Sequence, residues 1–521
     1  MEKPVGMKYL KFIGASLCVF SLLVFMTLLS MNRYQLSTAS FEQAVRPEHR
    51  ELLSPVLRDM QGKVYESTFD FVRDFKGGVR KVNLDLRERE EWDKIIWDDY
   101  SYSIVRHSNT GQVAEKAWTY FSLCFILAVF GGLIYIISSF KGSLPGIKNN
   151  GIFFTSSVNR GWMGIVLGSL LIAFYVLLYQ FPEYITNWVI MLDPLSMAIN
   201  GHMADQWFLY GFMYTLAMTV MGVRMMLKYR HSMYHLVRTA SVIFFQICFA
   251  FTLPQILKLL NKPSYDLKSI WPLEYTFFFD WRMDEHLAAG TFGIWMFVWG
   301  ILLFAIAVPV LTYFYGKRWY CSWVCGCGGL AETAGDPFRH LSDKRLISWK
   351  IERYMVHSVL VFAVLMTIGV LYTYLTGEGR ILGISTEGLR HVYGFVIGFA
   401  FAGVVGTGFY PLMGNRMWCR FGCPLAAYLG IIQRFKSRFR ITTNGGQCIS
   451  CGNCSTYCEM GIDVRWYAQR GQNVVRASCV GCGVCASVCP RGVLKLENGP
   501  GKFRISDDAI LIGSSSARLN D

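Results

Sequence analysis

The chain has 521 residues, of which 53% are hydrophobic and only 17% are charged, and its mean hydropathy is +0.32. This composition excludes a string of ordinary soluble domains and indicates that lipid surrounds much of the chain. The formal net charge of +15 does not indicate nucleic-acid binding. The basic residues lie mostly between apolar segments, where the positive-inside bias places them, and no Gly-rich phosphate loop occurs. We therefore expect membrane lipid, and no nucleic acid, as a partner.

Eight apolar segments are each close to the roughly 20 residues that a helix needs to cross a bilayer. They span residues 10–31, 118–139, 161–181, 207–227, 239–260, 289–315, 355–376 and 391–413. The first is longer than the apolar part of a signal peptide, about 7–15 residues, so we expect residues 1–31 to be an uncleaved transmembrane anchor. The sequence predicts an α-helical integral membrane protein with about eight transmembrane helices.

The basic residues predict the orientation of these helices. The loops after the second, fourth and sixth segments are rich in Lys and Arg, whereas the loop 182–206 contains neither. The positive-inside rule then places both termini in the cytoplasm, and we expect a multi-pass protein of the bacterial cytoplasmic (inner) membrane. Residues 32–117 would form a small outer, periplasmic domain, in which "FKGGVRKVNLDLRERE" predicts a turn followed by a short strand.

Cysteine placement agrees with this orientation. Of the 16 cysteines, only Cys18, Cys124 and Cys248 lie inside predicted helices, and all the others lie in predicted cytoplasmic segments. Thiols confined to a reducing compartment favour metal or cluster chemistry over a disulfide framework.

Two cysteine tetrads near the C-terminus carry the strongest signal. Cys448, Cys451, Cys454 and Cys458 follow C-x2-C-x2-C-x3-C spacing, and Cys479, Cys482, Cys485 and Cys489 repeat it. In a two-cluster ferredoxin the fourth cysteine of each tetrad ligates the other cluster. The spacing therefore predicts two [4Fe–4S] clusters. The first is held by Cys448, Cys451, Cys454 and Cys489, and the second by Cys479, Cys482, Cys485 and Cys458.

Zinc is a poor alternative, because zinc knuckles place a longer gap between two cysteine pairs. We expect this ferredoxin domain over 441–500, followed by a tail over 501–521. The first tetrad has Glu459 where the second has Pro490, which changes the turn after Cys458 but removes no ligand.

Two C-x3-C pairs follow predicted helices within the bundle 118–440. "CSWVCGCGG" contains Cys321 and Cys325 with an extra Cys327, and "CRFGCP" contains Cys419 and Cys423. Four interpretations are open: a local disulfide, joint ligation of a further metal or cluster, another redox role, and packing beside interfacial tryptophans. If the motifs were helical, the Cβ atoms would lie about 5–6 Å apart, too far for an unstrained disulfide. Neighbouring cations such as Lys317 are expected to lower the thiol pKa, which favours ligation or redox chemistry.

These motifs, in this order, resemble the membrane polyferredoxins, a family that includes NapH, the C-terminal part of NosR and CcoG. The resemblance covers about 289–500 and departs from the family at Gly326, where a proline is usual. It implies a helix bundle with a cytoplasmic two-cluster ferredoxin that serves electron transfer in a respiratory chain. Redox partner subunits are implied as well.

The leading functional hypothesis is therefore an electron-transfer subunit of an oxidoreductase. It would pass electrons between the quinone pool, or a membrane redox partner, and the two cytoplasmic clusters. The alternative is a copper-reducing assembly factor for a terminal oxidase, for which Met191, Met197 and Met203 offer soft ligands in one outer loop. A third reading is a membrane docking subunit whose clusters are structural.

Two histidine pairs are weaker signals. His231 and His235 are four residues apart and would suit a metal on one helix face, but a solvated loop pair is the plainer interpretation. His357 and His391 lie at opposite predicted ends of their helices, which argues against a haem.

Overall fold

The structure is a computed structural model that describes residues 5–141, 146, 155–381 and 383–499. The predicted tail 501–521 lies outside these residues. The chain forms two compact units. The first consists of Met1–Gly142 and Val176–Met213, and the second of Ser143–Tyr175 and Tyr214–Asp521. Each unit is described by itself.

Eight helices in the described part of the chain are long and apolar enough to cross a membrane, which confirms the predicted fold class. They span Gly6–Ser30, Ala117–Phe140, Trp162–Gln180, Gln206–Lys228, Met233–Leu259, Thr291–Tyr315, Leu346–Thr376 and Thr386–Gly408. Several contain wider π-type turns, a feature that is common near functional sites. These turns are η3 (Ser122–Ile126), η6 (Phe245–Thr252), η7 (Leu303–Ala307) and η9 (Gly394–Gly408).

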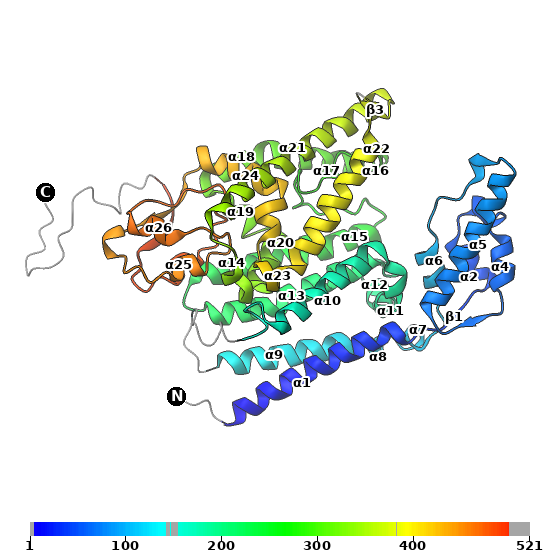
Figure 1. Cartoon of the computed structure of the whole chain (residues 1–521), viewed down its shortest axis with the longest axis horizontal. Helices are drawn as coiled ribbons and strands as arrows, with labels where there is room; N and C mark the ends of the chain where they lie inside the picture. The colour runs from blue at the N-terminus through cyan, green and yellow to red at the C-terminus, as the bar shows by residue number, and fades with distance from the viewer. Residues whose placement is uncertain (1–4, 142–145, 147–154, 382, 500–521) are drawn as a thin grey trace, which may run out of the picture. The chain divides into compact units, whose positions relative to one another are not determined.

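In the first unit, α1 (Val5–Thr27) and α9 (Leu127–Phe140) run side by side (Figure 1). A Cβ atom at Gly14 would lie 2.7 Å from the carbonyl oxygen of Gly131, and one at Gly131 would lie 2.9 Å from that of Gly14. Small residues at such a crossing let two membrane helices approach closely.

The rest of the first unit is a small helical domain. A two-stranded antiparallel sheet pairs β1 (Tyr34–Gln35) with β2 (Val64–Tyr65). Its helices are α2 (Thr38–Ala44), α3 (Pro47–Arg50), α4 (Ser54–Met60), α5 (Thr68–Glu88), η2 (Trp92–Lys94), α6 (Ser101–His107), α7 (Gln112–Glu115), α8 (Ala117–Phe121), η5 (Pro182–Ile185), α11 (Thr186–Ile190) and α12 (Asp193–Asn200). Tyr34, Phe41, Leu53 and Phe71 are central to its apolar core.

The prediction of a turn and a strand around "FKGGVRKVNLDLRERE" is wrong. The segment belongs to α5, which begins after Ser67, whose side chain accepts a hydrogen bond from the Asp70 amide. A Cβ atom at Gly78 would lie 2.7 Å from the Val56 side chain. The glycine therefore allows α5 to pack closely on α4 and does not mark a turn.

The second unit contains a helix bundle connected by short helices. Its elements are α14 (Met233–Phe244), α15 (Leu253–Leu259), α16 (Asp280–Ala288), α17 (Thr291–Leu302), α18 (Val308–Tyr315), α19 (Arg318–Cys321), α20 (Gly326–Thr333), η8 (Asp336–Leu341), α21 (Leu346–Thr376), β3 (Arg380–Ile381), β4 (Ile384–Ser385), α22 (Thr386–Tyr393), α23 (Tyr410–Met413), η10 (Trp418–Gly422) and α24 (Pro424–Phe435). Two further helices, α10 (Trp162–Gln180) and α13 (Gln206–Lys228), continue from one unit into the other.

The end of the second unit folds as a small ferredoxin-like segment (Figure 1). Strand β5 (Phe439–Thr443) pairs antiparallel with β6 (Leu494–Asn498), with Ile441 opposite Leu496. The short helices of this segment are η11 (Gly445–Gln447), which precedes the first cysteine loop, α25 (Asn453–Thr456), α26 (Val464–Gln469) and α27 (Val484–Ser487). Helices α25 and α27 contact each other, so the two tetrads meet at the centre of the segment.

Candidate functional site

The eight ferredoxin cysteines line two separate cavities. One is lined by Cys448, Cys451, Cys454 and Cys489, and we call it the outer cavity. The other is lined by Cys458, Cys479, Cys482 and Cys485, and we call it the inner cavity. Each cavity thus takes its fourth cysteine from the other tetrad, which is the grouping that the crossed ligand assignment requires.

The backbone of the two tetrads has the same conformation at corresponding positions. Ser450 and Gly481 precede the second cysteine with φ of 58° and 63°, and Gly452 and Gly483 follow it with φ of 79° and 82°. These left-handed residues curl the chain so that three cysteine side chains point into one cavity.

The loop Cys479–Cys482 is held by side chains of the helix bundle. Its carbonyl oxygens accept hydrogen bonds from four bundle side chains, one for each residue of the loop. The donors are Gln433 to Cys479 (2.8 Å), Ser322 to Val480 (2.8 Å), Tyr234 to Gly481 (2.7 Å) and Arg238 to Cys482. The inner cavity is therefore attached to the bundle by direct contacts.

Glu459, which follows Cys458, lies in a fully buried ion network. Its carboxylate contacts Arg339 at 2.6 Å and Arg416 at 3.1 Å. Arg416 also contacts Glu332 at 2.7 Å, and Arg339 contacts Asp336 at 2.8 Å. Glu459 thus replaces the usual proline with an ionic connection between the ferredoxin segment and the bundle.

Burial and ion pairing oppose each other at these carboxylates. Burial raises the pKa of Glu459, but Arg339 and Arg416 outweigh it and lower the pKa to about 2. Burial also opposes ionisation of Asp336, whose pKa is nevertheless held well below its ordinary value by Lys228, Arg224 and Arg339. Both groups are therefore carboxylates at neutral pH.

The two C-x3-C motifs meet at a third cavity. Cys321, Cys325 and Cys327 line it from α19 and α20, and Cys419 and Cys423 line it from η10 and the start of α24. We call it the five-cysteine cavity. All space not filled by atoms amounts to about 270 Å³ there, against about 360 Å³ in each ferredoxin cavity. All five thiols are free of disulfides, and their cavity is smaller than either ferredoxin cavity.

Neither C-x3-C motif is a continuous α-helix. Helix α19 ends at Cys321, and Cys325 caps the start of α20. In the same way Cys423 caps α24, and its sulfur accepts a hydrogen bond from the Ala426 amide at 3.4 Å. In each motif the second cysteine therefore lies in a turn at the start of a helix.

Neighbouring cations act on the thiol pKa in the expected direction, but burial outweighs them at most of these cysteines. Burial raises the pKa of Cys321 to about 12 and also raises the pKa of Cys419, although Lys317 and Arg416 act in the opposite direction. Only at Cys325 does a hydrogen bond from the Cys327 thiol lower the pKa, to about 6. Desolvation of a buried thiolate outweighs a nearby cation.

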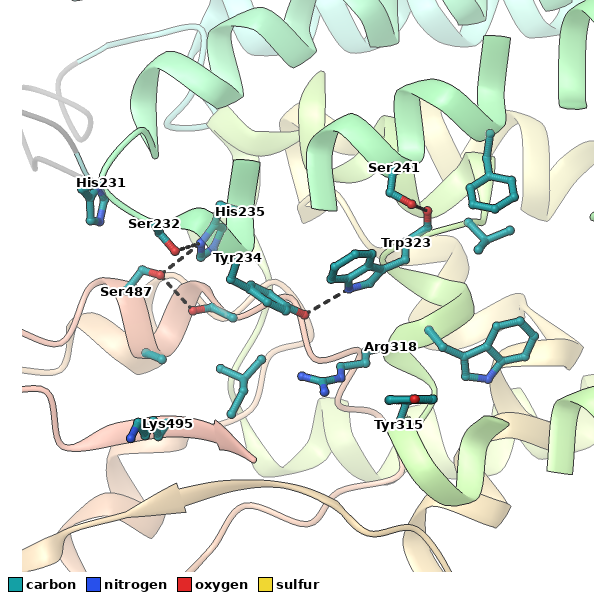
Figure 2. Close-up of a pocket in the computed structure, with 16 residues that line it drawn as sticks. His231, Ser232, Tyr234, His235, Ser241, Tyr315, Arg318, Trp323, Ser487 and Lys495 are labelled. Carbon is teal, nitrogen blue, oxygen red and sulfur yellow. Dashed lines mark hydrogen bonds between the residues drawn. The ribbon is translucent and has the colours of Figure 1, made fainter. Parts of the chain in front are cut away.

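A larger cavity lies where the helix bundle meets the ferredoxin segment (Figure 2). It has about 920 Å³ of water-accessible space. We call it the membrane-edge cavity, because Ser241 and Phe245 line it from the span Met233–Leu259 and Tyr315 ends the span Thr291–Tyr315. The ferredoxin segment contributes Gly483 and Ser487, which flank Cys485 in the sequence.

One of the two histidines expected in a solvated loop is buried here. His235 is 1% exposed and stacks on Tyr229 with ring centroids 4.6 Å apart, whereas His231 is exposed. Figure 2 shows His235 bonded through Nδ1 to Ser232 at 2.8 Å. Its Nε2 has no hydrogen-bond partner among the residues that the structure describes. The solvated interpretation therefore fails for His235.

The remaining candidate soft ligands differ in exposure. Met191 is fully buried, whereas Met197 and Met203 are 51% and 64% exposed, so the three do not share an environment. Cys124 is buried and Cys248 is exposed on the surface of a membrane-spanning helix.

Sequence reasoning missed the buried charges around the cavities. Glu332, Asp336 and Arg339 lie in "GLAETAGDPFRH", directly after a cysteine motif, and would ordinarily be taken for solvated loop residues. Their position next to cysteines and small residues could have indicated burial and ion pairing, because buried charges are usually paired.

Two known protein families match this half of the chain. A family described as a 4Fe-4S binding domain matches residues 297–346 and 393–442, which contain both C-x3-C motifs. A family described as a 4Fe-4S dicluster domain matches residues 447–494, which contain both tetrads. These matches confirm the prediction of two [4Fe–4S] clusters in a ferredoxin-like domain.

Two curated proteins are also similar. YccM of Escherichia coli, named for a suggested role in electron transport, is 25% identical over 158 residues, which are 28% of this chain and 43% of that protein. The methylamine utilization ferredoxin-type protein MauN of Methylobacillus flagellatus is 26% identical over 165 residues, 30% and 53% of the two chains. The similarity thus spans about half the length of these relatives. No solved structure matches.

Together, the families, the relatives and the eight spans confirm the resemblance to the membrane polyferredoxins. The chain therefore combines 4Fe-4S binding and dicluster domains with eight helices, in its described part, that are long and apolar enough to cross a membrane.

Proposed function

We propose that this chain carries electrons between a membrane quinone and its two [4Fe–4S] clusters, as a subunit of a respiratory assembly. The observation that carries the proposal is the position of Tyr234. This residue lines the membrane-edge cavity (Figure 2), and its hydroxyl donates a hydrogen bond to the Gly481 carbonyl in the loop of the inner cavity. A ligand in the membrane-edge cavity would therefore lie against the wall of a cluster site.

The lining of the membrane-edge cavity suits a quinone headgroup. Aromatic side chains form part of its walls, with Tyr234, Tyr315, Trp319 and Trp323 among the lining residues. Small-molecule sites typically combine such apolar walls with a few fixed polar groups. Because residues of two membrane spans contribute to the lining, an isoprenoid tail could remain in the bilayer while the ring enters.

The polar groups of the cavity can donate a hydrogen bond to a quinone carbonyl oxygen and stabilise negative charge on it. His235 Nδ1 lies 2.8 Å from the Ser232 hydroxyl and 3.3 Å from the Ser487 hydroxyl, which donates to the Gly483 carbonyl at 3.2 Å. We propose that the Ser232 hydroxyl donates to Nδ1. This places the ring proton on Nε2, the atom without a partner in the described structure. The guanidinium of Arg318 lies 5.9 Å from the Tyr234 ring centroid and would stabilise negative charge on a reduced ring.

We assign the ligands of the clusters from the cavities. Cys448, Cys451, Cys454 and Cys489 would hold one cluster, and Cys458, Cys479, Cys482 and Cys485 the other. Bound clusters would accept and release single electrons. The chain's own residues supply the surroundings, since the bundle's hydrogen bonds to the Cys479–Cys482 loop keep the inner cavity next to the membrane-edge cavity.

We further propose that the five-cysteine cavity holds a third anionic centre, a metal or an iron–sulfur cluster. Lys317 is only 2% exposed, and among the described residues its Nζ donates to the Ala426 carbonyl at 3.5 Å and contacts no carboxylate. A buried ammonium group without a carboxylate is costly unless another anion compensates it. Lys317 lowers the pKa of Cys321, Cys419 and Cys479, and Arg416 donates to the Cys419 sulfur at 3.5 Å. Arg416 therefore contacts one thiol directly, and Lys317 acts on the thiols electrostatically without lining their cavity.

The basic loops support a location in the bacterial inner membrane with both termini in the cytoplasm. The cysteine motifs lie within or directly after these basic loops, so the clusters would lie on the cytoplasmic side. Electrons that reach the clusters there would pass to a further redox partner subunit.

The test is reduction of the clusters by a quinol under anaerobic conditions. A short-chain quinol should reduce EPR-visible clusters in the wild-type protein, and His235→Gln should slow this about tenfold, since one hydrogen bond to a developing charge is lost. Reduction of His235→Gln by dithionite should be unchanged. The matched control is His391→Gln, an exposed histidine on α22. Wild-type clusters that no quinol reduces would refute the proposal, as would His235→Gln reacting at the wild-type rate.

A further inference from the structure

A second cavity of the helix bundle has a different character from the membrane-edge cavity. It has about 610 Å³ of water-accessible space and lies between α21 and α24. Four arginines line it: Arg353, Arg420, Arg434 and Arg476. We call it the arginine cavity.

Only one of these four arginines has a carboxylate partner. Arg420 contacts Glu352, the carboxylate that lines the cavity, at 2.7 Å. Among the residues described, Arg353, Arg434 and Arg476 have no carboxylate within ion-pair distance. Three uncompensated guanidinium groups around one cavity produce a strongly positive potential, and this favours an anionic ligand.

Two of these guanidinium groups are held in place by neutral partners. Arg476 lies over the Trp349 ring, 4.5 Å from its centroid, and donates to the Tyr467 hydroxyl at 3.0 Å. Arg434 donates to the Val475 carbonyl at 3.1 Å. These contacts satisfy part of each donor set and leave the charge uncompensated. Arginine in such fixed positions is well suited to phosphate, because its planar donors match the phosphate oxygens.

The surroundings of the arginine cavity are those of a membrane interface. The cavity is lined by residues of the first turns of α21, which form the beginning of the span Leu346–Thr376. Tyr354, Ile431 and Phe435 line it and are exposed, Phe435 by 75%. Ile347 and Ile351 on the same helix are exposed too. Apolar side chains exposed beside arginines indicate contact with acyl chains below a charged headgroup.

We propose that the arginine cavity binds the phosphodiester headgroup of an anionic phospholipid, with the acyl chains lying against α21 and Phe435. Basic pockets between membrane helices are a recognised way of holding such headgroups. A neutral quinone ring would leave the three charges uncompensated. Free phosphate would satisfy them but would make no use of the exposed apolar rim. The inference does not depend on the quinone proposal.

The experiment uses the full-length protein purified in a neutral detergent and stripped of lipid. Phosphatidylglycerol, phosphatidylcholine and inorganic phosphate are each titrated, and binding is followed by native mass spectrometry and by the thermal unfolding midpoint. We expect phosphatidylglycerol to bind and to raise the midpoint, and the other two to have little effect at equal concentration.

Substitution of the cavity arginines should weaken this binding specifically. Each Arg→Gln change at Arg353, Arg434 or Arg476 should lower the apparent affinity about fivefold, and the three together about 100-fold, from the usual contribution of one basic residue near anionic lipid. The control is the triple variant Arg345→Gln, Arg438→Gln and Arg440→Gln. It removes the same charge from arginines of the same unit that do not line the cavity.

The outcomes separate the sources of the anion. Equal affinity for phosphatidylglycerol in the cavity variant and the control variant would overturn the proposal, as would equal binding of phosphatidylcholine. Stabilisation by inorganic phosphate alone, to the same extent as by lipid, would overturn it in favour of a free anion. If the triple variant does not fold, the single variants carry the same test, because Arg353 is exposed and its ring contact is with Tyr354, the next residue of its own helix.

Discussion

The outer and inner ferredoxin cavities have the same cysteine spacing and the same backbone, yet their surroundings differ. Around the outer cavity, Cys451 is exposed and Ile449 is 55% exposed. Around the inner cavity, Glu459 is completely buried and bundle side chains bind the carbonyls of the Cys479–Cys482 loop. The repeated motif thus builds the cavity, and the flanking residues decide whether it faces solvent or the membrane bundle. An electron carrier that connects the two environments needs one cavity of each kind.

The largest effect should come from removing ligands. Cys489→Ser and Cys448→Ser should each abolish the same cluster, because both residues line the outer cavity, and each should lower the iron content by about four atoms. The double variant Cys448→Ser/Cys489→Ser should lose no more iron than either single variant. Iron analysis and EPR of anaerobically purified protein provide the measurement.

The opposite combination serves as the control. Cys448→Ser/Cys458→Ser should lose both clusters, since the two cysteines belong to one tetrad but line different cavities. If this variant retained one cluster while Cys448→Ser/Cys489→Ser lost two, each tetrad would hold its own cluster and the crossed assignment would be wrong.

The next largest effect should come from the buried ion network. Arg339→Met removes the cation that contacts Glu459, Glu332 and Asp336. Uncompensated buried carboxylates should reduce the free energy of unfolding by about 3–5 kcal/mol. Chemical unfolding in detergent measures this. We also expect the loss to expose the inner cavity, detected as faster reaction of its cysteines with a thiol reagent in apo-protein.

An exposed ion pair provides the comparison. Arg345 contacts Asp343 at 2.8 Å and its side chain is 79% exposed. Arg345→Gln should change the free energy of unfolding by about 0–1 kcal/mol. Equal effects of Arg339→Met and Arg345→Gln would show that the buried network does not hold the inner cavity to the bundle.

Much of the fold could be predicted because the signals are local. Apolar runs of bilayer length predicted all eight spans, and the spacing of the tetrads predicted which cysteines would share a cavity. The prediction failed where a residue type has two common environments. The pair Gly77–Gly78 is typical of a turn, but Gly78 serves close helix packing.

The surroundings of the site could not be predicted for a related reason. His235 and Glu332 are polar, and polar residues in loops are usually solvated. Their burial depends on partners far away in the sequence, such as Ser487 for His235 and Arg416 for Glu332. A single sequence contains no local pattern that connects such pairs. The cavities were therefore predictable, whereas the residues that anchor them were not.

Acid should remove the stability that buried Asp336 contributes. The pKa of Asp336 is depressed in the folded protein, so its contribution to stability is complete above its unfolded pKa of about 3.9. It is lost as the pH falls below that value. The thermal unfolding midpoint of the wild-type protein should therefore fall more steeply between pH 5 and pH 3 than that of Asp336→Asn, which is less stable at pH 7. Parallel curves for the two proteins would contradict this.

The smallest effect should distinguish two equivalent glycines. Gly452 and Gly483 have nearly the same φ, 79° and 82°, so Ala at either position costs about 1–2 kcal/mol of backbone strain. A Cβ atom at Gly483 would also lie 2.8 Å from the Tyr234 ring, whereas one at Gly452 has only the tip of Arg465 at 3.8 Å. Gly483→Ala should therefore reduce the free energy of unfolding by about 1–3 kcal/mol more than Gly452→Ala.

The same pair of variants also tests the connection between the inner cavity and the membrane-edge cavity. Because Tyr234 must move to accommodate the methyl group that Gly483→Ala adds, its hydrogen bond to the Gly481 carbonyl should lengthen, and quinol-dependent reduction should slow in Gly483→Ala but not in Gly452→Ala. Iron content should stay the same in both variants, since no ligand is changed. Equal stability and equal reduction rates in the two variants would mean that the loop Cys479–Cys482 is as free of the bundle as the loop Cys448–Cys451, and the difference between the two cavities would then have no functional consequence.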